Sequence, residues 1–139
     1  MKSVFIDTNV IIDFLANRAP FAFFAGKIFD FAEQKKLTIY ISAVSYNNIY
    51  YILKQGLNHS ATIKLITQLD NLTMVAAVDQ WVIQKAIQSN FKDFEDAIQH
   101  FCATSVKEVG LIITRDTNDY KKSELPVMTP EEAYYFLSI

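Results

Sequence analysis

Short apolar runs that lead into aspartates are the feature that most limits how this chain can fold. Val4-Phe5-Ile6 runs directly into Asp7, and Leu111-Ile112-Ile113 is followed three residues later by Asp116. Such runs are typical of parallel strands that are buried on both faces. Because the ligands of open α/β sheets bind at the carboxyl ends of the strands, both aspartates are expected to lie where a binding site forms.

Strand-like and helix-like segments alternate along the whole chain. The apolar and β-prone segments predict strands at residues 4–6, 37–41, 73–78, 111–114 and 126–128. Helical spacing predicts helices at residues 8–16, 21–34, 43–54, 59–71, 79–88 and 93–106, and a last one from 130. The expected N-caps are Asp7 or Thr8, Ser42, His59 or Ser60, Asp79 and Thr129. This alternation predicts an α/β fold, with a parallel sheet covered by helices on both faces.

The composition is that of one packed domain. Since the chain has 139 residues, 51% of them hydrophobic, and no linker-like stretch, we expect residues 1–139 to form a single domain. The single cysteine, Cys102, cannot form an internal disulfide, and no leader peptide is recognisable. No apolar run approaches the ~18 residues that span a bilayer. We therefore expect a cytoplasmic protein without a membrane-spanning segment.

The charge balance limits how the chain can bind nucleic acid. A net charge of −2 argues against a surface that binds phosphates in general, because such binding depends on Lys and Arg. A nuclease stays open, since a metal-filled acidic pocket can attract a scissile phosphate while nearby cations hold the flanks. The candidate RNA contacts, each of which is also an ordinary surface cation when taken singly, are Arg18, Lys54 and Arg115, with Lys121 and Lys122.

Two further pairs of aspartates could join Asp7. Asp93 and Asp96 are one helical turn apart, so they share a helix face and can point together into a pocket. Of Asp116 and Asp119, one is expected to face the site and the other to cap or turn the loop. If the fold gathers these carboxylates, their mutual repulsion is costly unless a divalent cation neutralises it. A divalent metal ion is therefore the expected cofactor.

The acidic residues also have a purely structural interpretation. Asp7 could serve only as a helix cap, and Asp93 with Asp96 could form a solvated acidic first turn. His100, one turn beyond Asp96, is expected to pair with that carboxylate or to be exposed, because hard cations prefer oxygen ligands.

The polar residues around the acids have alternative roles as well. Asn9 could hold the Asp7 side chain, bind a metal-bound water or bond to nearby backbone. Thr114 could orient a carboxylate by its hydroxyl. Arg115 is either a phosphate contact or the counter-ion of the acidic loop.

Taken together, these residues make the sequence resemble the PIN-domain family, and especially the VapC-type toxin-like ribonucleases of bacterial toxin–antitoxin pairs. The resemblance covers nearly the whole chain, and its motifs are Phe5-Ile6-Asp7-Thr8-Asn9-Val10-Ile11-Ile12-Asp13, Ile112-Ile113-Thr114-Arg115-Asp116 and Thr129-Pro130-Glu131-Glu132. It implies a three-layer α/β/α sandwich with a central parallel sheet and a Mg²⁺ or Mn²⁺ site. It also implies hydrolysis of RNA by metal-activated water, a small antitoxin partner and a homodimer.

The resemblance assigns roles to individual residues. Asp7, Asp96 and Asp116 match the family's first, third and fourth acidic ligands, so they are the expected catalytic and metal-binding residues. The expected supporting residues, which would bind the metal through water or orient its ligands, are Asn9, Asn48, Asp93, Thr114 and Asp119.

One position departs from the usual family pattern. The family usually has a Glu in the helix after the second strand, and this chain has Asn48 there, which removes one negative charge and is expected to weaken metal binding. The chain resembles a PIN subgroup with Asn at this point. The main alternative to the nuclease is therefore a catalytically weak PIN scaffold that binds RNA or a protein partner. A phosphoryl-transfer domain with an Asp nucleophile is a third candidate, but it would need an acid where Asn9 stands or a Lys after the late strand.

Overall fold

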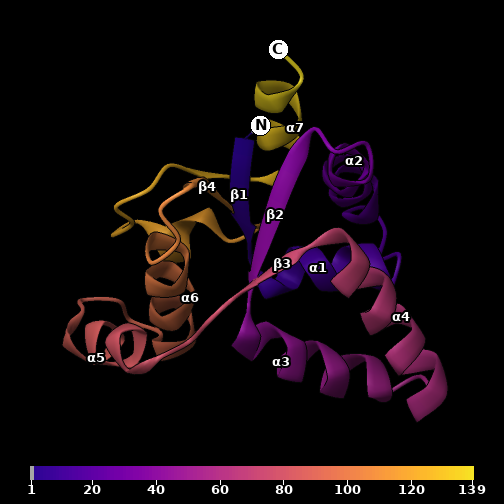
Figure 1. Ribbon diagram of the computed structural model, residues 1–139, viewed down its shortest axis with the longest axis horizontal. Coiled ribbons are helices and arrows are strands. Elements are labelled where there is room, and N and C mark those ends of the chain that lie inside the picture. The colour runs from indigo at the N-terminus through magenta and orange to yellow at the C-terminus, as the bar shows by residue number, and fades with distance from the viewer. Residues whose placement is uncertain (1) are drawn as a thin grey trace.

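A five-stranded parallel sheet forms the centre of the computed structural model, which describes residues 2–139 (Figure 1). Its strands are β1 (Lys2–Ile6), β2 (Leu37–Ser42), β3 (Met74–Ala76), β4 (Val109–Ile113) and β5 (Val127–Met128). The helices are α1 (Thr8–Leu15), α2 (Ala22–Glu33), α3 (Ala43–Lys54), α4 (His59–Leu72), α5 (Gln80–Gln88), α6 (Phe94–Thr104) and α7 (Pro130–Leu137), with the 3-10 helix η1 (Thr117–Tyr120). Between residues 2 and 139, none of the helices has the length and apolar content that a bilayer crossing requires.

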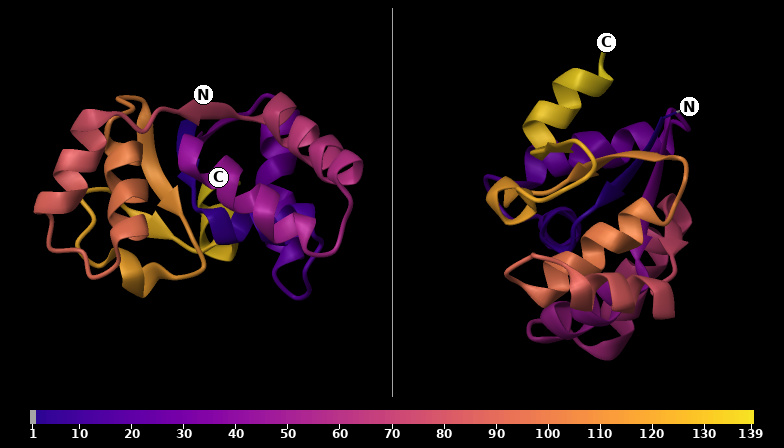
Figure 2. Two further views of the ribbon diagram at one scale, coloured as in Figure 1. Left: turned by 90° about the horizontal axis from the view of Figure 1, so that it is seen from below. Right: turned by 90° about the vertical axis from the view of Figure 1, so that its left-hand side faces the viewer.

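Helices cover both faces of the sheet, as Figures 1 and 2 show. Val4 and Ile6 of β1 belong to a core that they share with α1, α2, α4 and α7. Phe5 belongs to a second core on the other face, with Ile112 and side chains of α5 and α6. Because alternate residues of a strand point to opposite faces, an all-apolar strand such as β1 needs a helix layer on each side. The expected three-layer α/β/α sandwich with a parallel sheet is confirmed.

The helix starts follow their local sequence. Side chains cap α1, α3, α5, α6 and α7 at Asp7, Ser42, Asp79, Asp93 and Thr129. One predicted cap is wrong: α4 is capped by Asn58, and not by His59 or Ser60. The Asn58 Oδ1 atom accepts a hydrogen bond from the Ala61 amide at 2.8 Å. The extended backbone at Asn58 makes this bond possible, and Asn is as good an N-cap as Ser.

All five strands differ from the predicted ranges. β1 begins at Lys2 and not at residue 4, β2 ends at Ser42 and not at residue 41, and β5 begins at Val127 and not at residue 126. β3 is shorter than the expected 73–78, because it lies at the sheet edge and pairs only with residues 40–42 of β2. β4 begins at Val109, two residues earlier than expected, and ends at Ile113. Thr114 therefore lies just beyond the strand, at the carboxyl edge of the sheet.

The strand order is β3-β2-β1-β4-β5, so the connections reverse direction at β1. The chain leaves β1 for β2 on one side and later returns to β4 on the other. The Asp7 amide donates a hydrogen bond to the Ile113 carbonyl oxygen at 2.9 Å, so β1 and β4 end side by side. A crevice at such a reversal is the usual place for a ligand in an open α/β sheet.

Candidate functional site

Asp7 lies at the end of β1, where the strand turns directly into α1. Its side chain is only 7% exposed. Oδ1 accepts a hydrogen bond from the Thr8 amide at 2.8 Å, and Oδ2 accepts one from the Thr114 hydroxyl at 2.8 Å. Burial raises the pKa of Asp7, and the interactions with Thr114, Thr8 and the Tyr120 hydroxyl offset only part of that rise. In the part of the chain that the structure describes, both ion pairs involve Asp13, so no Lys, Arg or His pairs with Asp7.

Thr114 and Asn9 connect Asp7 with Asp116. Besides donating to Asp7, the Thr114 hydroxyl accepts a hydrogen bond from the Asp116 amide at 3.1 Å. Asn9 Nδ2 donates to Asp116 Oδ2 at 2.9 Å, and Asn9 Oδ1 accepts from the Arg115 amide at 3.4 Å. The loop after β4 is thereby held against the start of α1, with the Asp116 carboxylate on the side of Asp7.

Asp93 and Asp96 lie at the start of α6. Asp93 is its N-cap, and its Oδ1 accepts a hydrogen bond from the Asp96 amide at 2.9 Å. Asp96 is half-buried, and its pKa is raised to about 7 by that burial and by the negative charges of Asp93, Asp7 and Asp119. Asp96 is therefore within electrostatic reach of Asp7, although the two residues are far apart in the chain.

Asp119 lies on η1 and is exposed. Its charge contributes to the raised pKa of Asp96, whereas Asp116 is the member of the pair that bonds to Asn9. Asp116 is thus connected to Asp7 through Thr114, whereas Asp119 acts electrostatically on Asp96.

Two residues near these acids were not identified from the sequence. Glu95, the neighbour of Asp96, accepts a hydrogen bond at Oε1 from Asn48 Nδ2, and its charge raises the pKa of both Asp7 and Asp96. Tyr120 is 2% exposed, and its hydroxyl interacts with the Asp7 carboxylate. Its pKa is raised by burial and by the charges of Asp7 and Asp96. Nothing in the sequence marks Tyr120, but Glu95 could have been suspected from its place between the two aspartates of α6.

A buried polar network holds three helices together behind Asp7. Gln99 Nε2 donates to the Thr8 hydroxyl at 3.0 Å and to the Ser45 hydroxyl at 2.9 Å. The two hydroxyls are themselves 2.7 Å apart. Because these three fully or nearly fully buried residues come from α6, α1 and α3, the network fixes the relative positions of the helices that carry Asp96, Asp7 and Asn48.

Arg115 and Arg18 both pair with Asp13, which is 1% exposed. Arg115 Nε lies 2.6 Å from Asp13 Oδ2, and Arg18 Nη2 lies 2.8 Å from Asp13 Oδ1. The Arg115 guanidinium also lies 4.0 Å from the centre of the Phe21 ring. Lys54, the third candidate cation, is exposed at the last turn of α3, at the opposite end of that helix from Ser42.

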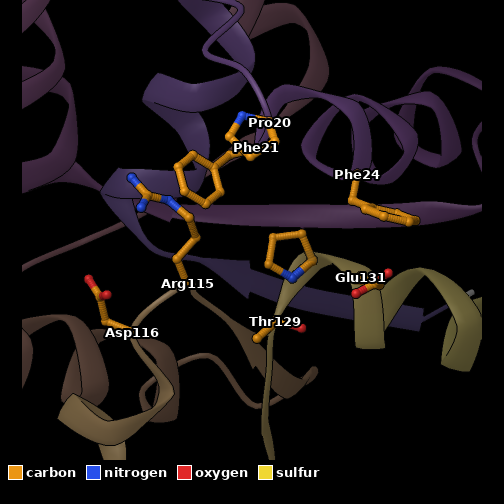
Figure 3. A pocket seen from close by; sticks show the side chains of 8 residues that line it. Pro20, Phe21, Phe24, Arg115, Asp116, Thr129 and Glu131 are labelled. Carbon is orange, nitrogen blue, oxygen red and sulfur yellow. The ribbon is translucent and has the colours of Figure 1, made fainter.

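The acids open onto two separate hollows. One, of about 310 Å³, is lined by Pro20, Phe21, Phe24, Arg115, Asp116, Thr129, Pro130 and Glu131. Figure 3 shows Arg115 and Asp116 side by side at one end of it and Glu131 at the other. The second, of about 500 Å³, is lined by Asn90, Phe91, Lys92, Asp93, Asp96, Asn118, Asp119, Lys121 and Lys122. Lysines therefore stand beside Asp96 and Asp119.

The expectation for His100 is wrong. Its side chain is buried, and Nε2 accepts a hydrogen bond from the Glu124 amide at 3.0 Å. Burial lowers the pKa of this histidine, which therefore acts as a neutral acceptor for the loop before β5. It neither pairs with Asp96 nor faces solvent, because its ring packs against Phe91 and Phe101 and its Nε2 atom binds the Glu124 amide.

The chemistry of the donor set suits a hard divalent cation. Asp7, Asp96, Asp116 and Glu95 offer only oxygen, the ligand atom that Mg²⁺ and Mn²⁺ prefer. The raised pKa values of Asp7 and Asp96 reflect burial and neighbouring negative charges, Glu95 for both and also Asp7 for Asp96, whose cost a cation would relieve. Within residues 2–139, however, no three acidic, His or Cys side chains are arranged as a ready-made ion cluster. The residue types fit a metal ion, since all of them offer oxygen.

A family comparison agrees with this geometry. The model of the PIN domain matches residues 3–118. This chain belongs to the PIN-domain family. The match covers β1 to η1 and includes Asp7, Asp96 and Asp116, so the resemblance noted from the sequence is confirmed. No curated protein sequence matches this PIN-domain chain.

Solved structures with the same fold include VapC-type proteins. FitAcB from Neisseria gonorrhoeae is 20% identical with a TM-score of 0.62, covering 92% of this chain and 98% of that chain. VapBC-1 from nontypeable Haemophilus influenzae is 16% identical with a TM-score of 0.67, covering 93% and 98%. VapC20 from Mycobacterium tuberculosis, described as a Sarcin-Ricin loop cleaving toxin, is 17% identical with a TM-score of 0.57, covering 78% and 86%. At these identities the similarity shows the fold alone.

Proposed function

We propose that this PIN-domain chain is a Mg²⁺- or Mn²⁺-dependent endoribonuclease and the toxin of a toxin–antitoxin pair. The observation that carries the proposal is the buried Asp7 carboxylate, which has no cationic partner within residues 2–139 and lies at the strand-order reversal. A buried charge without a partner is costly. Asp96 and Asp116 add further negative charge beside it, so an external cation would stabilise the site.

The residues of the chain would divide the work as follows. Asp7, Asp96 and Asp116 would hold the metal, while Thr114 and Asn9 fix the orientation of two of these carboxylates by hydrogen bonds. Asp93 and Asp119 would bind the metal through water. When bound, the metal would polarise the scissile phosphate and lower the pKa of a water for in-line attack.

The cations around the site differ in how free they are to contact RNA. Arg18 and Arg115 are engaged with Asp13, and Lys54 is distant from the acids along α3. Lys92, Lys121 and Lys122 share a hollow with Asp96 and Asp119. We propose that these lysines hold the phosphates that flank the cleaved bond, with Arg18, Lys54 and Arg115 as outer contacts.

The proposal extends to partners and location. The similar structures FitAcB and VapBC-1, and VapBC2 from Rickettsia felis, which is described as bound to a DNA fragment from its promoter, support a small antitoxin as partner. We further propose that residues 1–139 form one domain, that the protein is a homodimer and that it acts in the cytoplasm.

Asn48 favours one alternative, a PIN scaffold that binds RNA or a protein without cleaving. In that case the site would carry too little charge to hold a metal tightly. The scaffold differs from the nuclease in a measurable way, because its RNA binding would not depend on a divalent cation.

A titration with Mg²⁺ and with Mn²⁺, followed by cleavage of a mixed single-stranded RNA, tests the proposal. We expect metal-dependent cleavage that Asp7→Asn and Asp96→Asn each reduce by about 100- to 1,000-fold, since several kcal/mol of metal-supplied charge stabilisation would be lost. Asp30→Asn, an exposed aspartate on α2, is the matched control. RNA binding that needs no metal and is not followed by cleavage would establish the scaffold instead.

A further inference from the structure

Asn48 stands where the PIN-domain family usually has a Glu, and its side-chain amide contacts a different carboxylate, that of Glu95. Asn48 lies on α3, where the family usually has a Glu, and cannot contribute a negative charge. Its Nδ2 nevertheless donates a hydrogen bond to Oε1 of Glu95 on α6. The Glu95 carboxylate is therefore in contact with Asn48, the residue that stands where the family usually has a Glu.

The Glu95 carboxylate acts on the same groups as the aspartates of the site. Its negative charge contributes to the raised pKa values of Asp7, Asp96 and Tyr120. These three residues come from different elements, so the Glu95 charge acts on several groups of the site. Glu95 is exposed at the start of α6, and the bond to Asn48 holds its carboxylate toward α3.

The buried Tyr120 hydroxyl lies beside the same carboxylates. It is almost completely buried, interacts with the Asp7 carboxylate and faces the charges of Asp96 and Glu95.

We propose that Glu95 is the fourth carboxylate of the metal centre, in place of the acid absent at position 48, and that Asn48 is its positioning residue. This inference rests on the proposed function. Adjacent residues of a helix point about 100° apart, so Glu95 and Asp96 approach an ion from different directions. Glu95 on α6 thus supplies the negative charge that α3 lacks because residue 48 is Asn.

Metal affinity of the full chain, measured calorimetrically with Mn²⁺, tests this assignment. We expect Glu95→Gln to weaken Mn²⁺ binding about 10- to 100-fold and Asn48→Ala to weaken it about tenfold. The double variant Asn48→Glu with Glu95→Gln places the carboxylate back on α3 and is expected to restore most of the affinity. Glu108→Gln is the matched control, because Glu108 is exposed just before Val109, at the opposite edge of the sheet.

The competing explanation is that the Asn48–Glu95 bond only ties α3 to α6. Thermal unfolding without metal distinguishes this structural role from the metal-binding role. If the bond is only structural, both single variants should be less stable than wild type and should bind Mn²⁺ with unchanged affinity. If wild type binds Mn²⁺ and cleaves RNA while Glu95→Gln does so equally well, the assignment of Glu95 is overturned and the nuclease stands. If wild type binds no Mn²⁺, the nuclease proposal and the assignment fall together.

Discussion

Asp7 and Asp13 are both buried at α1, but within residues 2–139 only Asp13 has positively charged partners. Asp7 caps α1, accepts hydrogen bonds from the uncharged Thr8 amide and Thr114 hydroxyl, and interacts with the uncharged Tyr120 hydroxyl. Asp13, less than two turns further on, is paired with Arg18 and Arg115. Both side chains are more than nine-tenths buried.

The difference shows how the same residue type serves stability in one place and binding in another. At Asp13 the chain supplies the compensating charge itself, so the carboxylate joins α1 to the loop after β4. At Asp7 the described part of the chain supplies only uncharged hydrogen-bond donors, and the raised pKa of Asp7 shows that these donors do not fully offset the cost of burying the charge. A carboxylate left in this condition is available to an external cation.

The sharpest test of this comparison is stability after removal of each charge. Asp13→Asn is expected to destabilise the protein by about 3 kcal/mol, because it leaves two arginines without their buried partner. Asp7→Asn is expected to leave stability unchanged or to raise it, since Asn still caps the helix and the unpaired charge is gone. Urea unfolding of the metal-free proteins measures both. Equal losses in the two variants would mean that Asp7 is an ordinary structural aspartate.

Thr114 tests whether Asp7 and Asp116 act as a connected pair. Thr114→Val keeps the shape but leaves Asp7 Oδ2 and the Asp116 amide without a partner. We expect a loss of roughly 1–2 kcal/mol in stability and about a tenfold loss in Mn²⁺ affinity. Thr67→Val is the control, because the Thr67 hydroxyl is exposed and bonds only within its own helix. Unchanged affinity in Thr114→Val would separate Asp116 from the site.

The smallest expected effect is a pH dependence caused by Asp96. Its pKa is about 7 in the folded chain, above the ordinary value of 3.8, so the folded state holds its proton more tightly. Stability of the metal-free protein should therefore fall as pH rises from about 4 to about 7. Since Asp96 is only half-buried and partly screened by water, we expect the loss to be on the order of 1 kcal/mol or less.

Comparing wild type with Asp96→Asn isolates this contribution from other groups that titrate in the same range. The variant should become the more stable protein as pH rises, and saturating Mn²⁺ should bring wild type back above it. Parallel stability curves for the two proteins would contradict the raised pKa of Asp96.

Most of the fold was predictable because its signals are local. The apolar residues 4–6 require burial on both faces, and capping residues such as Asp79 and Thr129 mark helix starts without reference to the rest of the chain. The misplaced cap of α4 arose because Asn58 and Ser60 lie two residues apart and are equally good N-caps. The shorter β3 reflects pairing at the sheet edge, which its own residues do not reveal.

The sequence by itself determined an α/β chain whose acids follow its strands, and it named Asp7, Asp96 and Asp116 as a set. Only the tertiary structure decided what each charge faces. It placed Arg18 and Arg115 on Asp13, turned His100 into the interior and brought Glu95 to Asn48. The physical reason is that helix and strand patterns depend on neighbours in the chain, whereas the state of a charge depends on groups that packing brings together from distant segments.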